Sequence, residues 1–379
     1  MNLPMAERRL TAMENNKSQT KWINQMEPWF GEEEKQAICE YMDAGGWMTE
    51  FKQTREFERL IAEYVGSRFC SVLSNGTLTL FAALIGLGIG SGDEVIVPDF
   101  TMIASANAVV LTGARPVFVD INPFDLCLDL DLAEKAITAK TKAIMLVSFN
   151  GRSPDMRKAL TLAESHGLHL VEDAAQSLGS YYKGKHLGTY GKIGSFSFSA
   201  PKVITTGQGG ALVTDDPQLD DSIRKIKDFG RTQSGVDFHE RLGYNFKFTD
   251  LQAVVGIAQM KKVGWRVQRK KEMFDLYRRN LEDVPAVKFV ATNLEETSPW
   301  FIDILVPDAP PLAAFLKEQG VGTRPFYPPI HSQPAYGQDG SFPASSEVSV
   351  HGLWLPSSTF LSDEDINGIS MKIRKFYSL

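Results

Sequence analysis

Short apolar runs alternate with helical segments in this chain, and the alternation constrains the fold more than any other feature. Phe69–Leu73 is typical of a buried strand, and a helical pattern over Leu78–Leu87 follows it. The same order continues to residue 173, with strands expected over 94–97, 116–119, 143–147 and 168–172 and helices over 104–111, 132–137 and 155–166. Strands separated by crossover helices pair in parallel. We therefore predict an α/β fold with a mainly parallel central sheet and helices on both faces.

The pattern differs before and after this stretch. Residues 1–28 are polar and mixed in charge, without the apolar centre of a signal peptide, and we expect a flexible lead-in. The segment from Gly31 to Tyr64 has a helical pattern that begins with acidic residues. We expect the large domain to span residues 29–262.

A smaller C-terminal α/β domain is expected over 263–379. An apolar helix over Thr249–Val263 precedes a basic helix over Trp265–Leu281, and the two could be continuous. Short strands and further helices follow over 287–290, 300–306, 312–319 and 363–376.

Composition argues against several classes of function. The net charge is −6 and no basic cluster is present, which does not favour a nucleic-acid or membrane partner. Cys39, Cys70 and Cys127 are odd in number and unclustered, so neither a disulfide framework nor a metal site is indicated. We predict a cytoplasmic protein without a metal.

Lys202 is the most informative single residue. It lies in the run Gly194–Gly210, which is otherwise apolar, rich in hydroxyl groups and closed by glycines. A lysine in such surroundings is poorly solvated, so its neutral amine becomes accessible and can form a Schiff base with a carbonyl compound. The ordinary alternative is a surface lysine at the mouth of a buried strand. Asp173, an acid at the end of an apolar strand, favours the chemical interpretation.

Three features fall where strands end. Ser74–Thr77 precedes a helix and either holds a phosphate or simply caps that helix. Asp173 either caps the next element or meets a buried cation. Lys202 follows Ser197, whose hydroxyl is a second possible phosphate donor. A phosphate site, a buried acid and a buried lysine in this order suit pyridoxal phosphate, whose aldehyde, ring nitrogen and phosphate they would hold.

These segments resemble the DegT/StrS family of sugar-nucleotide aminotransferases, within the fold type I pyridoxal-phosphate enzymes. The likeness runs from about Trp29 to the C-terminus and includes Ser74–Thr77, Gly92–Pro98, Pro116–Asp120, Glu172–Gln176, Phe196–Phe198, Lys202, Gly209–Gly210 and Gly243–Asp250. Thr323–Tyr327 with His331 further resembles the perosamine-synthase branch, which aminates C4 of a nucleotide-linked 4-keto-6-deoxy sugar.

The resemblance implies a role for each matched residue. Lys202 would bind the cofactor aldehyde and then move the proton between cofactor and substrate, while Asp173 would pair with the ring nitrogen. Lys247 would reach across a dimer interface to the partner's cofactor phosphate. The remaining cofactor contacts would be Asn75, Gly76, Thr77, Met102, Gln176 and Ser197, and the candidate substrate contacts are Asn150, Arg324 and His331.

The sequence departs from the family pattern on the expected substrate side. Met102 stands where an aromatic residue usually stacks on the cofactor ring, so either its thioether or Phe100 covers that face. The common Gly-Glu-Gly-Gly run reads Gly207-Gln208-Gly209-Gly210 here. Ser148 and Asn150 replace a usual histidine and aromatic residue.

The resemblance implies a pyridoxal-phosphate aminotransferase. It would move an amino group from L-glutamate to a nucleotide-linked keto sugar, with pyridoxamine phosphate as the intermediate cofactor form. The expected setting is surface polysaccharide or glycoconjugate biosynthesis, such as lipopolysaccharide O-antigen, by a homodimer whose active site lies at the subunit interface. A sugar dehydratase of the same family and a non-catalytic regulator are the alternatives. The dehydratase branch carries histidine in place of the lysine, so Lys202 argues against it, and an intact Lys202 and Asp173 argue against the regulator.

Overall fold

A seven-stranded sheet forms the centre of the larger part of the molecule. The computed structural model describes residues 22–233, 235–337 and 339–378. Strand β9 runs antiparallel to both of its neighbours, and the other adjacent strands are parallel. The order across the sheet is β1 (Phe69–Leu73), β9 (Gly210–Thr214), β8 (Ile193–Ser197), β5 (His169–Asp173), β4 (Thr141–Val147), β2 (Glu94–Pro98) and β3 (Arg115–Val119). The predicted mainly parallel sheet is confirmed.

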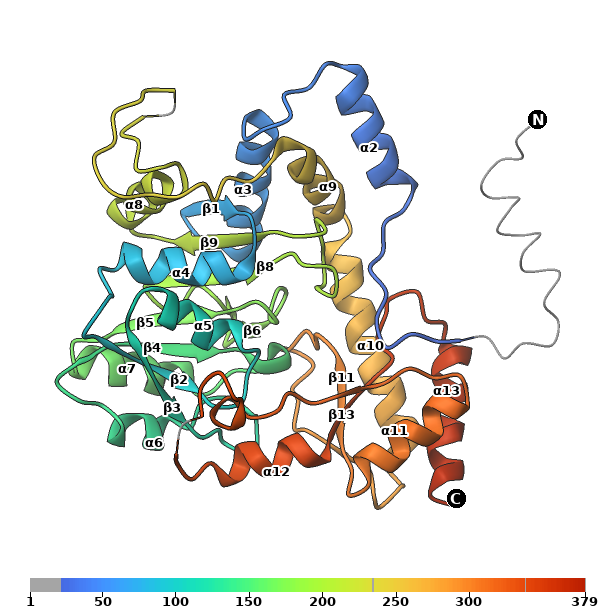
Figure 1. The fold of residues 1–379 in the computed structure, drawn as a ribbon. Coiled ribbons are helices and arrows are strands. Elements are labelled where there is room, and N and C mark those ends of the chain that lie inside the picture. The colour runs from blue at the N-terminus through green and yellow to red at the C-terminus, as the bar shows by residue number, and fades with distance from the viewer. Residues whose placement is uncertain (1–21, 234, 338, 379) are drawn as a thin grey trace.

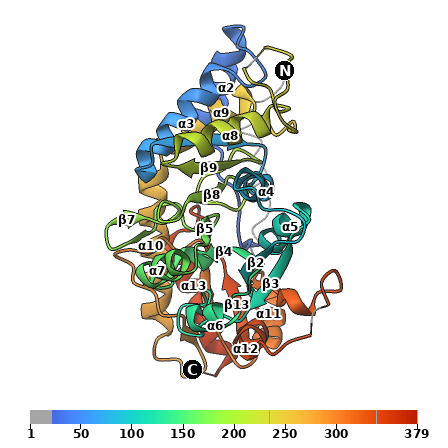
Figure 2. The same cartoon turned by 90° about the vertical axis from the view of Figure 1, so that its left-hand side faces the viewer.

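Helices cover both faces of this sheet, as the strand pattern predicts (Figure 2). Val95 and Val97 of β2 face one apolar cluster, and Ile96 between them faces another, because successive side chains point to opposite faces. The first cluster includes residues of α4 (Gly76–Gly86), α5 (Ala104–Leu111) and α8 (Pro217–Lys227). On the other face lie α6 (Leu130–Lys135) and α7 (Met156–Ser165). A short hairpin of β6 (Tyr181–Tyr182) and β7 (Lys185–His186) follows β5 in the chain.

The N-terminal helical segment is two helices rather than one. α2 (Glu32–Asp43) ends before Gly45, whose φ of 69° lies in the left-handed region that favours glycine. α3 (Lys52–Val65) then begins without a local side-chain cap. Its first N–H groups bond instead to the carboxylate of Asp250, far along the chain, with N···O distances of 2.7–3.0 Å. Tertiary contact therefore starts a helix that periodicity alone joins to its neighbour.

A four-stranded antiparallel sheet lies in the C-terminal part. Its order is β10 (Lys288–Phe289), β11 (Ile302–Leu305), β13 (Gly352–Leu355) and β12 (Arg324–Pro325). The helices here are α11 (Ala309–Glu318), α12 (Pro343–His351) and α13 (Asp363–Phe376), with short 3₁₀ turns at η1 (Phe149–Gly151) and η2 (Ile330–Ser332) elsewhere in the chain.

Most of the expected lead-in, residues 1–21, lies outside the described residues. Its last part is packed rather than loose. Ile23 pairs with Val321 and joins the apolar cluster beneath the four-stranded sheet, which the prediction of a lead-in over 1–28 did not anticipate.

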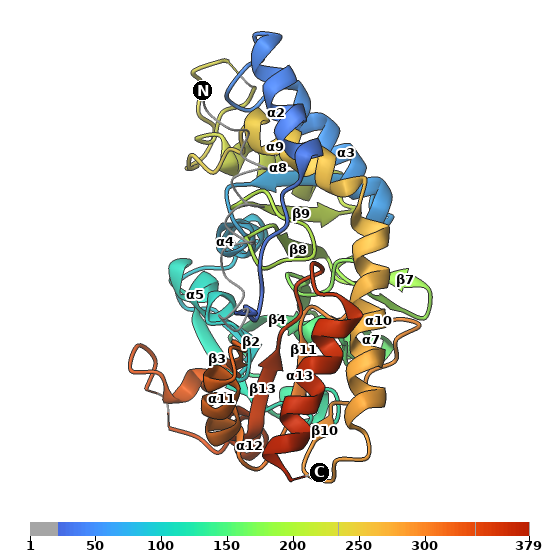
Figure 3. The same ribbon diagram turned by 90° about the vertical axis from the view of Figure 1, so that its right-hand side faces the viewer.

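Helix α10 connects the two cores. α9 (Asp250–Met260) and α10 (Val263–Leu281) are separate helices, interrupted at Lys261 and Lys262. Val263 packs with the large sheet, whereas residues from Met273 onward pack with the four-stranded sheet and α13. Figures 1 and 3 show α10 running from the helices above β9 down to α13. The expected domain boundary therefore falls at the start of a helix that serves both cores.

Two side chains near η1 tie the sheets together. The amide of Asn150 donates to the carbonyl of Phe301 at 2.8 Å and accepts from its N–H at 2.7 Å. Arg152 forms a buried ion pair with Asp303 of β11, at 2.6 Å. No helix within the described ranges is both long and apolar enough to cross a lipid bilayer.

Candidate active site

The predicted cofactor residues meet in one cavity of about 580 Å³ at the carboxyl ends of the parallel strands. Ligands collect at this edge of an open α/β sheet because the connections there leave a crevice. The cavity is lined by Asn75, Gly76, Thr77, Leu78, Leu80, Met102, Ala104, Asp173, Ala175, Gln176, Ser197, Ser199, Lys202 and Gln208. Of the expected cofactor contacts, Lys247 alone does not line it.

The turn before α4 forms one end of the cavity. Asn75 caps the helix, since its Oδ1 accepts the N–H of Leu78 at 3.0 Å. Among the described residues, the N–H groups of Gly76 and Thr77 have no hydrogen-bond acceptor. A Cβ at Gly76 would lie 2.9 Å from the Cβ of Ser197. Two free N–H groups at a positive helix end, next to a serine side chain, are donors of the kind that a phosphate favours.

Asp173 is a buried carboxylate at the end of β5. Its Oδ2 accepts the hydroxyl of Ser105 at 2.6 Å, and its Oδ1 accepts the N–H of Ala175 at 3.2 Å. Burial raises the pKa of Asp173, and these donors and the charge of Lys202 oppose that rise. Within the described part of the chain no ion pair occupies this carboxylate. It is therefore available to a cationic group of a ligand.

Lys202 follows β8 in a tight turn, where its N–H bonds to the carbonyl of Ser199 at 3.0 Å. Its Nζ stands 4.0 Å from the centre of the Trp300 ring. Burial lowers the pKa of Lys202 to about 8, with Arg324 adding to this effect and Asp173 opposing it. The neutral amine is therefore more accessible at neutral pH than in a solvated lysine. Lys202 can act as a nucleophile and as a base.

Met102, not Phe100, reaches the cavity. Met102 is exposed there, whereas Phe100 is fully buried between Phe149 and Phe326. The thioether is thus the side chain available to cover a ring face. Gln176 also lines the cavity, and its Oε1 accepts the N–H of Asn150 at 2.7 Å.

The three candidate substrate residues lie outside this lining. Asn150 is completely buried, and both ends of its amide are bonded to the backbone of Phe301, so its expected contact with substrate stays a prediction that this geometry does not favour. Arg324 is exposed and stands 5.5 Å from the rings of Tyr327 and Trp354. His331 is held by Asp99, which accepts its Nδ1 at 2.7 Å.

Lys247 pairs with Asp228 of its own chain at 2.8 Å and stands over the ring of Phe229. Its reach toward a partner subunit stays a prediction. Phe238 and Leu242, in the segment just before it, are strongly exposed apolar residues.

Sequence reasoning missed several residues at the site. Ser105 orients Asp173, and Trp300 lies against Lys202, but neither stands in a recognisable motif. Ser199 and Gln208 line the cavity and belong to the glycine-closed run around Lys202, so that run carried a signal for them.

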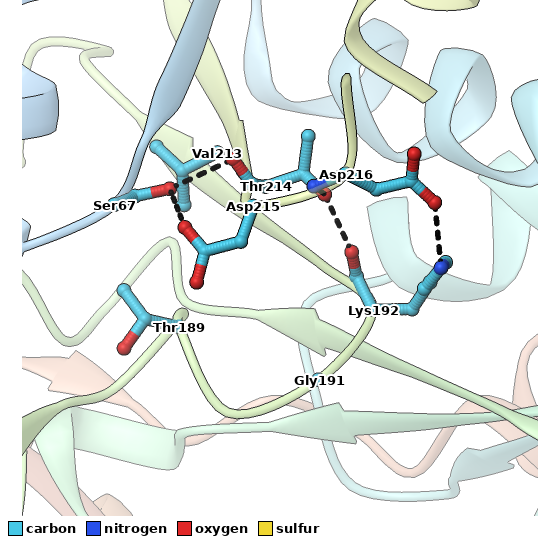
Figure 4. A pocket seen from close by; sticks show the side chains of 8 residues that line it. All are labelled: Ser67, Thr189, Gly191, Lys192, Val213, Thr214, Asp215 and Asp216. Atoms are coloured by element: carbon cyan, nitrogen blue, oxygen red, sulfur yellow. Dashed lines mark hydrogen bonds and ion pairs between the residues drawn. The ribbon is translucent and has the colours of Figure 1, made fainter. Parts of the chain in front are cut away.

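A second hollow of about 360 Å³ lies at the opposite end of β9, between Ser67, Lys192 and Asp215. Figure 4 shows Ser67 directed toward Asp215 and Lys192 toward Asp216, while Thr189 stands apart. Lys192 pairs with Asp216 at 2.6 Å, and Asp215 accepts the N–H of Arg68 at 2.8 Å. Because these groups satisfy each other, the hollow offers little to a ligand. No cluster of histidine, cysteine or acidic side chains in the described ranges is suited to a metal ion.

The main cavity fits pyridoxal phosphate on three observations. Gly76 leaves room for an anion where a Cβ would collide with Ser197. Asp173 is a buried carboxylate that pairs with no cation among the described residues, and burial lowers the pKa of the Lys202 amine. These groups suit the phosphate, the ring nitrogen and the aldehyde of that cofactor, respectively.

Comparison with known proteins gives the family. The family model described as DegT/DnrJ/EryC1/StrS aminotransferase matches residues 29–374. GDP-perosamine synthase from Escherichia coli O157:H7 is 36% identical over 362 residues, covering 94% of this chain and 99% of that protein. DesV of S. venezuelae superposes with a TM-score of 0.87 at 33% identity, over 92% of this chain and 95% of that one. The PLP form of Spr1654 from Streptococcus pneumoniae has a TM-score of 0.88 at 27% identity, over 93% and 98% of the two chains.

Proposed function

The chain belongs to the DegT/DnrJ/EryC1/StrS aminotransferase family and is a pyridoxal-phosphate-dependent aminotransferase; from this premise we propose that it transfers an amino group from L-glutamate to a nucleotide-linked keto sugar. The sugar we propose is a 4-keto-6-deoxy sugar, because the GDP-perosamine synthase relative matches along nearly its whole length. The proposal rests on one observation: Lys202 and Asp173 line the same cavity, beside the free N–H groups of the first two residues of α4.

Pyridoxal phosphate, when bound, supplies an aldehyde that captures amines and a ring that accepts electrons. Gly76, Thr77 and Ser197 would hold its phosphate through N–H and hydroxyl donors. Asp173 would hold the protonated ring nitrogen, because a buried carboxylate without another cation strongly favours one.

Lys202 has two tasks in this proposal. Its neutral amine would hold the cofactor at its aldehyde, and as a free amine Lys202 would take up and return the proton at the substrate carbon. A lysine with a pKa of about 8 accepts and returns a proton near neutral pH with little cost in either direction.

The same residues serve both half-reactions. The first would convert glutamate to 2-oxoglutarate while the cofactor keeps the amino group, and the second would give that amino group to the sugar ketone in exchange for its oxygen. Arg324 and His331 stay our proposed contacts to the nucleotide-linked sugar, and a homodimer would bring Lys247 to the partner's cofactor phosphate. Surface polysaccharide synthesis is the proposed setting, again from the perosamine-synthase relative.

The experiment is a transamination assay with purified full-length protein, pyridoxal phosphate and glutamate. A panel of nucleotide-linked keto sugars is supplied, and both 2-oxoglutarate and the amino sugar are measured by mass spectrometry. We expect both products in equal amounts, and loss of both with Lys202→Ala. Lys142→Ala, which removes an exposed lysine on β4, is the matched control and should leave the yield unchanged.

Three outcomes contradict the proposal. Loss of water from the sugar without 2-oxoglutarate formation would indicate the dehydratase, and binding without turnover of any sugar would indicate a regulator. Full activity in Lys202→Ala would remove the proposed chemistry altogether.

A further inference from the structure

The indole ring of Trp300 lies against the amine of Lys202. The Nζ of Lys202 stands 4.0 Å from the ring centre, well inside the range of about 6 Å over which an aromatic face attracts a cation. The same indole donates its Nε1–H to the carbonyl of Pro201, at 2.8 Å. Trp300 therefore contacts both the reactive amine and the backbone that immediately precedes it.

Trp300 is itself firmly held. It is 2% exposed and stacks on Phe301 with ring centres 3.8 Å apart. The buried amine of Lys270 on α10 donates to the carbonyl of Trp300 at 2.9 Å and also to the carbonyl of Ser357. Phe301 is fastened in turn to Asn150 near the large sheet. The ring thus has little freedom to leave the amine.

Few groups compete with the ring for the amine. Asp173 of β5 faces it and favours its charged form, while Arg324 of β12 faces it and disfavours that form. Tyr327 has its hydroxyl near both of these charges, and burial keeps it neutral by raising its pKa. In the described part of the chain, the Nζ of Lys202 makes no hydrogen bond and no ion pair. The indole face therefore attracts the ammonium form at close range, whereas the carboxylate of Asp173 forms no ion pair with it.

We propose that Trp300 is a positioning residue for Lys202: its indole face holds the amine at the cavity and stabilises the ammonium form that appears each time the amine takes up a proton. The proposal extends the role given to Lys202. It rests on the proposed function only where it assumes that Lys202 takes up a proton during catalysis. The contact itself belongs to the chain alone and can be measured without cofactor.

Fluorinated tryptophan gives the sharpest test, because fluorine withdraws electrons from the ring face while the shape and the N–H are kept. The full chain is produced with ordinary, 5-fluoro- or 5,7-difluorotryptophan and freed of cofactor. Lys202 is then titrated by brief acetic anhydride labelling at a series of pH values, with its peptide quantified by mass spectrometry. We expect the titration midpoint of Lys202 to fall stepwise with fluorination, by about half a pH unit in total.

The variant Trp300→Phe supplies the control for the other tryptophans. In that background the remaining indoles, including Trp354 near Arg324, are still fluorinated, and the midpoint should no longer respond. Trp265→Phe, which removes a half-exposed indole on α10, should leave the full response in place.

An unchanged midpoint across the fluorinated series would overturn the proposal, as would a response of equal size in Trp300→Phe. If Trp300→Phe lowers the melting temperature but leaves the titration midpoint of Lys202 unchanged, Trp300 has a purely structural role. That result would also overturn the proposal. None of these outcomes depends on amine transfer, so a failed transamination assay and a failed titration remain distinguishable.

Discussion

Replacing Gly76 with alanine tests the proposed phosphate site. The new Cβ would lie 2.9 Å from the Cβ of Ser197 and 3.2 Å from its Oγ, where ordinary contacts begin at 3.4 Å. The Cβ of Ser197 belongs to strand β8 and cannot swing aside as the end of a long side chain could. The start of α4 must therefore move by about half an ångström or more, which would withdraw its first N–H groups from a bound anion.

The expected magnitude follows from the bonds at risk. One charge-assisted hydrogen bond contributes about 1.5–3 kcal/mol, so the dissociation constant of pyridoxal phosphate should rise by about 10- to 150-fold. Helix propensity acts in the opposite direction, since alanine is favoured over glycine by about 1 kcal/mol within a helix. The variant should consequently bind cofactor poorly without a comparable loss of stability in the cofactor-free form.

Fluorescence titration of the cofactor-free protein measures this, with pyridoxal as a second ligand that lacks the phosphate. We expect Gly76→Ala to weaken pyridoxal phosphate and to leave pyridoxal binding nearly unchanged. Gly264→Ala is the matched control, because nothing lies within 4 Å of a Cβ at that position in α10. Equal loss for both ligands, or no loss for either, would refute the reasoning.

Three further predictions concern the site and its support. Arg152→Met leaves Asp303 buried without a partner, so urea denaturation should show a loss of about 3–5 kcal/mol in unfolding free energy; a loss below 1 kcal/mol would contradict this. Ser105→Ala removes the 2.6 Å bond to Asp173, so steady-state kinetics should show kcat lowered by about tenfold with KM for glutamate retained; an unchanged kcat would exclude the role given to Ser105. In cofactor-free protein, the neutral fraction of Lys202 increases with pH, so its rate of combination with pyridoxal phosphate should rise through pH 8 and then level off. Stopped-flow absorbance measures this rate, and a rate profile with its midpoint near pH 10 would contradict the lowered pKa of Lys202.

Local pattern predicts much of this fold because the strands of the large sheet are short, apolar and bounded by turns. Phe69–Leu73 and Ala104–Leu111 were predicted with the bounds that the structure has. The turn before α4, Asp173 and Lys202 were also found from the sequence, since each stands at the end of a strand where a parallel sheet gathers ligands.

The residues that escaped prediction act through contacts distant in the chain. Asp250 starts α3 across nearly two hundred residues, and no local signal marks the end of α2 except Gly45. Trp300 meets Lys202 because a loop before β11 folds back onto the large sheet. Asn150 stands where the family carries an aromatic residue, but its complete burial and its bonds to Phe301 depend on the packed structure.

The ties from η1 to β11 bear on how such an enzyme can change its substrate during evolution. The four-stranded sheet carries Arg324, but it cannot be exchanged as a module, because a foreign sheet would have to bring an acid for Arg152 and a matching backbone for Asn150. A sheet without these partners would leave the buried guanidinium of Arg152 and the buried amide of Asn150 without hydrogen-bond partners. A change of substrate specificity is therefore more accessible through single substitutions at the rim of the cavity than through exchange of the whole four-stranded sheet.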